Sequence, residues 1–198
     1  QPLAADDVAA SLAFYCALTN RTIMARTAIL REHGYREDFP RCQDYELHQR
    51  LSRTQRMANL ADILVCGREH SGRFTKQTDA LGRERKREIC RRALIETGLV
   101  PSEADLDRHY ALARPKKLGA ALNEEYLGWV DQWLARLDAA NRRSRRHVPE
   151  ALTRVMTERW IDLCWHARRQ LGSAAYLRLI RSPLARRLPA TLLRRLAS

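Results

Sequence analysis

Side chains that could carry out chemistry are concentrated in the segment QDYELHQR, residues 43–50. Pro40 interrupts regular structure just before it, and Glu46 and Arg50, four residues apart, favour a helix from there on. Asp44 is therefore expected near the N-terminus of that helix, where the helix dipole favours an ionised carboxylate. Such a group can accept a proton as a general base, but spacing alone favours a helix N-cap for Asp44.

The other metal-binding and redox signals in the chain are weak. The Asp-x-Asp pair formed by Asp105 and Asp107 follows Ser102, which predicts the acidic first turn of a helix and not a metal site. The five cysteines lie more than twenty residues apart without a CxxC pair, so neither a zinc site nor a disulfide framework is indicated. A reduced, cytosolic setting fits this cysteine usage.

The elements that must position these residues are mostly helices. Apolar spacing and breaks at Gly and Pro predict helices at about residues 6–18, 78–96, 102 onward, 126–137 and 149–171, with a short amphipathic stretch after 189. Residues 21–26 and 63–65 favour short strands. The fold class expected is α+β, predominantly helical, with a first unit over residues 1–77 and an all-α region over 78–198. Tyr126, Trp129 and Trp133 have the spacing of core residues.

The order of motifs over residues 20–77 resembles the second half of the catalytic domain of family 2 (GT-A type) glycosyltransferases. The segments NRTIMARTAIL, HGYRED, QDYELHQRL and ANLADILVCGREH are similar to a strand ending in "TVM-R", a "GGYDE" turn, an "ED-EL--R" motif and "NL-E-L--YR-H----S". The residues around Trp133 to Leu137, Asn141, and Arg159 to Cys164 are similar to the helical C-terminal extension of certain bacterial members.

The resemblance implies roles for the QDYEL segment. Asp44 matches the Asp of the "ED" pair and would be the general base of an inverting sugar transfer, while Glu46 and Arg50 would support its helix. Gln43 would contact the acceptor, although it stands where the family usually has Glu. Other departures are His48 for an aromatic residue, Gly67 for the Tyr of "YR", Thr75 for Ser, and Arg21 for a small residue or Pro.

The resemblance also implies a phosphate contact in GREH. Arg68 would neutralise the diphosphate of the donor, and His70 would bind phosphate or a divalent metal; the alternative for both is a surface position at a strand end. The family holds Mg²⁺ or Mn²⁺ with an acidic pair in an N-terminal βαβ region, and neither that region nor its main metal ligands are found here. The isolated chain is therefore expected to bind a nucleotide sugar poorly and to be inactive.

The uneven distribution of charge suggests further function classes. Residues 1–82 hold 11 Lys and Arg against 10 Asp and Glu, whereas residues 83–198 hold 25 against 13. The arginine-rich second half could be a solvated helical face, a docking surface for anionic membrane where lipid-linked acceptors lie, or part of a basic helical nucleic-acid-binding module. Nucleic acid is the disfavoured partner because no recognition motif is present. The location expected is cytoplasmic, with a peripheral position at the inner face of the cell membrane as a further expectation.

Overall fold

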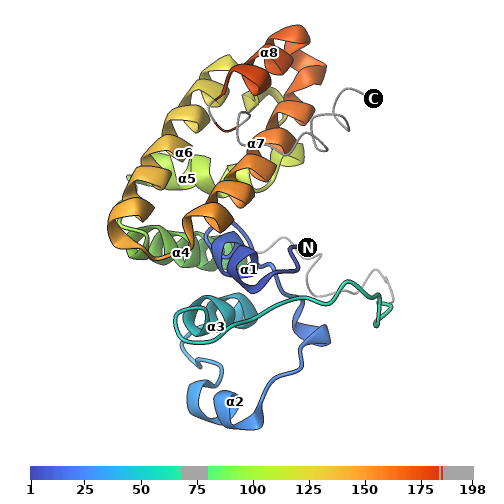
Figure 1. Cartoon of the computed structure of the whole chain (residues 1–198), viewed down its shortest axis with the longest axis vertical. Helices are drawn as coiled ribbons and strands as arrows, with labels where there is room; N and C mark the ends of the chain where they lie inside the picture. The colour runs from blue at the N-terminus through green and yellow to red at the C-terminus, as the bar shows by residue number, and fades with distance from the viewer. Residues whose placement is uncertain (68–79, 183, 185–198) are drawn as a thin grey trace.

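The computed structural model describes residues 1–67, 80–182 and 184, and this part of the chain is predominantly helical (Figure 1). In chain order the helices are α1 (Ala5–Ser11), η1 (Asn20–Thr22), α2 (Thr27–His33), α3 (Gln43–Leu51), α4 (Ala80–Glu96), α5 (Glu103–Leu112), η3 (Pro115–Lys117), η4 (Gly119–Ala121), α6 (Glu124–Ser144), α7 (Pro149–Leu171) and α8 (Ser173–Arg181).

The two strands expected from the sequence do not form within the described residues. Residues 20–22 make one turn of 3-10 helix, after which the backbone is extended at Ile23 and Arg26 without a pairing partner. Residues 63–67 have no regular structure either. A strand needs a neighbour for its backbone N–H and C=O groups, and the described chain offers neither segment one. The α+β expectation is therefore wrong for these residues, whereas the predominance of helix is confirmed.

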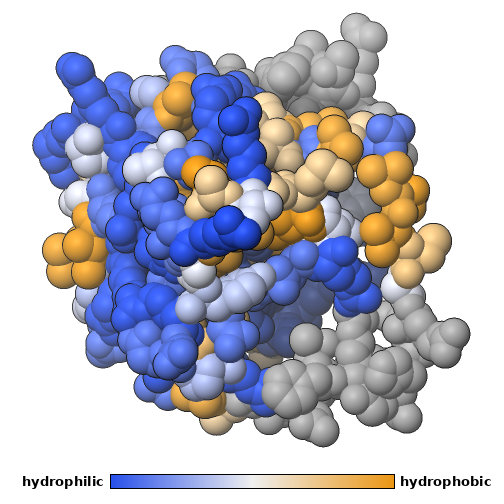
Figure 2. All heavy atoms as spheres, turned by 90° about the horizontal axis from the view of Figure 1, so that it is seen from below, coloured by the Kyte–Doolittle hydropathy of each residue, from blue (hydrophilic) through white to orange (hydrophobic). Residues whose placement is uncertain are grey.

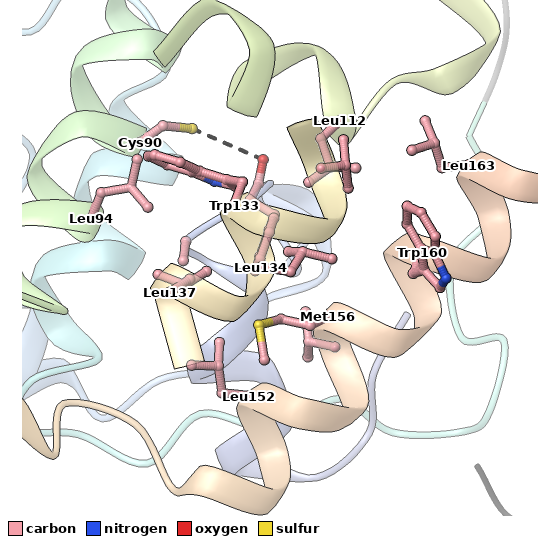
Figure 3. Packing of buried hydrophobic residues seen from close by; sticks show 14 of the residues in the cluster. Cys90, Leu94, Leu112, Trp133, Leu134, Leu137, Leu152, Met156, Trp160 and Leu163 are labelled. Carbon is pink, nitrogen blue, oxygen red and sulfur yellow. Dashed lines mark hydrogen bonds between the residues drawn. The ribbon is translucent and has the colours of Figure 1, made fainter. Parts of the chain in front are cut away.

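The main core lies between the long helices of the second half and the end of α1. Leu134 and Leu137 of α6 face Leu152 and Met156 of α7, and Trp133 of α6 lies beside Cys90 and Leu94 of α4 (Figure 3). Trp133 is completely buried, and Tyr126 is 6% exposed. The prediction of core residues is therefore confirmed for Tyr126 and Trp133, whereas Trp129 is partly buried and packs against this core. Burial of such large side chains stabilises the fold.

The ends of these helices follow the chemistry expected from the sequence. Ser102 and Asp105 form a capping box at the start of α5, and Asp105 also accepts a hydrogen bond from the indole Nε1 of Trp129 at 3.1 Å. The helix 149–171 begins at Pro149 and ends at Gly172, whose φ of +54° is a left-handed conformation that favours glycine. Helix α8 begins directly after that glycine and was not predicted from the sequence.

Helices α1 and α3 carry the segment with the candidate site. The Tyr45 hydroxyl of α3 donates to the carbonyl oxygen of Leu12 at 2.7 Å, and both residues belong to a second small core with Phe39 and Ile89 of α4. Phe14, two residues after Leu12, is part of the main core. The two cores therefore meet at the turn that follows α1, and this turn holds α3 in a fixed position against the helical region.

Candidate functional site

Asp44 lies in the first turn of α3, as the sequence predicts, but it is not the N-cap. Cys42 occupies the N-cap position with a left-handed φ of +58°, and no side chain caps the helix there. The half-buried Asp44 carboxylate accepts a hydrogen bond from the backbone N–H of Tyr45 at 2.9 Å through Oδ1. Among the described residues no Lys or Arg forms an ion pair with it. The carboxylate therefore keeps acceptor capacity that no cation within the described chain occupies.

Two polar side chains lie around Asp44 that the sequence motif did not single out as site residues. Cys16, from the turn after α1, places its thiol 3.6 Å from Nδ1 of His48, one turn after Asp44 on α3. Burial, with a smaller contribution from the negative charge of Asp44, raises the pKa of Cys16 to about 12. Burial also lowers the pKa of His48, against the opposing effect of Asp44. The thiol is therefore protonated and the imidazole neutral at physiological pH.

Glu46 has a different environment from Asp44, although the two carboxylates are only two residues apart. Its side chain is 4% exposed and accepts hydrogen bonds from Arg50 Nε at 3.2 Å and Nη2 at 3.1 Å. Arg50 also donates to the backbone oxygens of His33 and Gly34, which end α2. The pair therefore joins the C-terminus of α2 to α3, and Glu46 is fully engaged in that contact.

Of the other substrate-binding residues named from the sequence, one lies beside Asp44 and two lie outside the described residues. Gln43 is the exposed first residue of α3, adjacent to Asp44. Arg68 and His70 lie outside the described residues. Within the described chain no group of three His, Cys, Asp or Glu side chains could hold a metal ion. The described residues therefore do not by themselves fit the Mg²⁺ or Mn²⁺ expected in the whole enzyme.

Two departures from the family pattern, Arg21 and Gly67, lie in contact. A Cβ atom added at Gly67 would come within 2.8 Å of Nη1 of Arg21. The small residue at 67 therefore leaves room for the guanidinium group at 21.

The comparisons with known proteins found a match at low sequence identity. No protein-family model matches the chain, and no solved structure matches it. An uncharacterized glycosyltransferase of Haemophilus influenzae is 26% identical over 136 residues, which cover 64% of this chain and 42% of the relative. The chain thus spans less than half the length of the curated relative that it matches.

The sequence contained one signal for the cluster around Asp44. His48 stands four residues after Asp44, the spacing that places two side chains on the same face of a helix. Cys16 lies 28 residues before Asp44. Its thiol reaches His48 in this cluster only because the turn after α1 packs on α3. No local pattern could have identified that neighbour.

Proposed function

We propose that this chain is the acceptor-side part of an inverting, family 2-like glycosyltransferase, with Asp44 as its general base. The ordered motifs over residues 20–77 and the name of the Haemophilus relative support the class of enzyme. The observation that carries the assignment of the base is the contrast within one helical turn. Glu46 is buried and paired with Arg50, whereas Asp44 is partly accessible and has no cation partner among the described residues.

The proposed step moves one proton and exchanges one bond. Asp44 accepts the proton of an acceptor hydroxyl while that oxygen attacks the anomeric carbon of the donor sugar. The bond from the anomeric carbon to the diphosphate oxygen breaks on the opposite face, and its electron pair leaves with the nucleotide diphosphate. Attack opposite the leaving group inverts the configuration. Gln43, next to the base on the exposed end of α3, is positioned to hydrogen-bond the acceptor sugar.

Exposed apolar residues in segments 21–26 and 63–67, which pair with no strand of the described chain, are consistent with a donor-binding half outside this chain. Met24 is 98% exposed, and Ile63 and Leu64 are 90% and 72% exposed. The view from below shows a largely hydrophilic face with a hydrophobic group at the edge beside the atoms drawn in grey (Figure 2). Exposed apolar side chains favour contact with another protein surface. We propose that the nucleotide-binding half supplies that surface, together with the residues that hold Mg²⁺ or Mn²⁺.

The test of the base uses the protein in the full length that its gene encodes, with a panel of nucleotide sugars and acceptor glycans. Asp44→Asn should lower transfer by about 100-fold or more, the range of general base catalysis, while donor binding is retained. Glu125→Gln, which removes one exposed carboxylate at the start of α6, is the matched control and should keep full activity. Transfer by Asp44→Asn at the rate of the control would refute the assignment.

The isolated chain gives an independent test of the missing half. Calorimetric titration of residues 1–198 with nucleotide sugars, with and without Mg²⁺ or Mn²⁺, should show no tight binding. Tight, metal-dependent binding to this chain alone would contradict the proposal.

An anionic membrane surface is the proposed location of the acceptor, reached through the basic C-terminal part of the chain. No described helix is long and apolar enough to cross a membrane. Near the described end of the chain, Trp165, Leu177 and Ile180 are 48%, 42% and 45% exposed, and Arg168 lies over the Trp165 ring at 3.4 Å. Exposed apolar and aromatic side chains next to arginine favour a membrane interface. The whole chain should float with anionic vesicles, and a chain without residues 164–198 should not. Equal flotation of the two forms would count against this surface.

A further inference from the structure

A cleft of about 220 Å³ lies at the opposite end of α3 from Asp44. It is formed where three segments meet: the start of α1, the turn after α3, and the loop between α6 and α7. The lining residues that matter for binding are Asp6, Arg53, Arg56, Arg146, His147 and Val148. The cleft is smaller than the roughly 300–1,000 Å³ of sites that hold drug-sized ligands, so it suits one compact group.

The charged groups of the cleft favour an anion. Three arginines line it, and two carboxylates partly offset them. Glu96 accepts a hydrogen bond from Nε of Arg146 at 3.1 Å and another from Arg53, while Asp6 lies 3.8 Å from Arg56. This leaves one positive charge in excess. It also fixes two of the guanidinium groups in place, with donor N–H groups remaining for a ligand.

His147 adds a buried polar group that has no partner in the described chain. The residue is 7% exposed, and neither ring nitrogen forms a hydrogen bond. Its backbone is held on both sides by Asn141, whose side chain accepts from the His147 N–H at 2.9 Å and donates to the His147 oxygen at 3.0 Å. Both ring nitrogens are shielded from solvent, so His147 forms part of the cleft wall without presenting a free donor or acceptor to the cleft.

The N-terminus of α7 completes the electrostatics. This helix of 23 residues begins after Val148, which lines the cleft, and no side chain caps it. The free backbone N–H groups and the helix dipole place partial positive charge at the same end.

We propose that this cleft binds a phosphate group, held by Arg53, Arg56 and Arg146, with His147 in the wall of the cleft, where its ring signals report binding. Phosphate offers oxygens in several directions, which matches donors that arrive from three segments of the chain. The site lies at the other end of α3 from Asp44 and does not depend on the proposed transferase activity.

The test is a titration of the whole chain with inorganic phosphate at constant ionic strength, followed by calorimetry and by the NMR signals of the histidine rings. Saturable binding of one phosphate with a shift of the His147 signals is the expected result. Arg56→Gln should weaken binding at least about tenfold, since one charge-assisted hydrogen bond is lost. The Arg56 side chain is 80% exposed, so this variant should fold normally.

Arg108→Gln is the matched control, because it removes one arginine from α5, whose residues do not line the cleft. It should bind phosphate as the unmodified chain does. Absence of saturable binding, an unchanged His147 signal, or equal weakening by Arg56→Gln and Arg108→Gln would overturn the site.

Two further ligands identify the source of the phosphate. A soluble hexose phosphate and vesicles containing phosphatidic acid are each tested as competitors of inorganic phosphate. Displacement by either one, lost in Arg56→Gln, supports the site and shows whether its ligand is a soluble metabolite or a lipid headgroup. Failure of both to displace inorganic phosphate would contradict a phosphomonoester site.

Discussion

Acidification should destabilise this protein through two buried histidines, His109 and His147. His109 bridges three parts of the core: its Nε2 lies 2.8 Å from the carbonyl oxygen of Ala13, and its Nδ1 accepts from the Trp133 indole at 3.0 Å. These contacts require a neutral ring with its proton on Nε2. Burial lowers the pKa of His109 to about 4. Burial, assisted by the neighbouring charge of Arg146, likewise lowers the pKa of His147 to about 4.

The sign of the effect follows from the two pKa values of each ring. In the unfolded chain each histidine titrates at 6.5, so between pH 6.5 and about 4 the unfolded state binds protons that the folded state does not. Stability is therefore complete above pH 6.5 and is lost as the pH falls toward 4. At about 1.4 kcal/mol for each pH unit, each histidine accounts for roughly 3 kcal/mol in total and for about 2 kcal/mol between pH 7 and pH 5.

Guanidinium denaturation at pH 7, 6 and 5, followed by tryptophan fluorescence, measures this loss. The chain should lose about 4 kcal/mol of unfolding free energy between pH 7 and pH 5, and His109→Gln and His147→Gln should each lose about 2 kcal/mol, because one titrating group remains. The buried histidine His48 shifts in the same direction and adds to the loss in all three proteins. Working above pH 5 limits the contribution of carboxylates. An equal pH dependence in the chain and both variants would refute the reasoning.

Three substitutions test other contacts of the fold by the same denaturation assay at pH 7. Glu46→Gln should cost about 2–3 kcal/mol, because Arg50 loses the anion that holds it between α2 and α3. Trp133→Phe should cost about 2 kcal/mol, through lost volume and an unsatisfied His109 Nδ1. Asn141→Ala should cost about 2–4 kcal/mol, because the backbone N–H and C=O of residue 147 both lose their partner.

Two of these have a matched comparison. Glu37→Gln, at an exposed position before α3, removes one carboxylate outside the contact of Glu46 with Arg50 and should change stability by less than about 0.5 kcal/mol. Equal losses for Glu37→Gln and Glu46→Gln would show that the buried pair does not join the two helices. For Trp133, a loss no larger in the Trp133→Phe chain than in a Trp165→Phe chain, where the side chain is half exposed, would contradict its place in the core.

Local sequence determined the helices well because their signals are local. Ser102 with Asp105, Pro149, Gly172 and the apolar spacing of α6 and α7 all act within a few residues of themselves. The first turn of α3 around Asp44 could be predicted for the same reason. The strands were a different case: residues 21–26 and 63–65 carry β-forming side chains, but a strand depends on a partner that the sequence of the segment does not contain.

For the candidate site, the sequence by itself determined which side chains could act: a carboxylate at the start of a helix, its neighbour Gln43, and a supporting pair at Glu46 and Arg50. Tertiary structure decided which carboxylate is buried and paired and which remains accessible, because burial depends on the elements that pack around α3. It also decided which side chains lie near Asp44 and which residues form the proposed phosphate cleft. Cys16 meets His48, and Arg53 meets Arg146, across 32 and 93 residues of chain, and only packing brings groups so distant together.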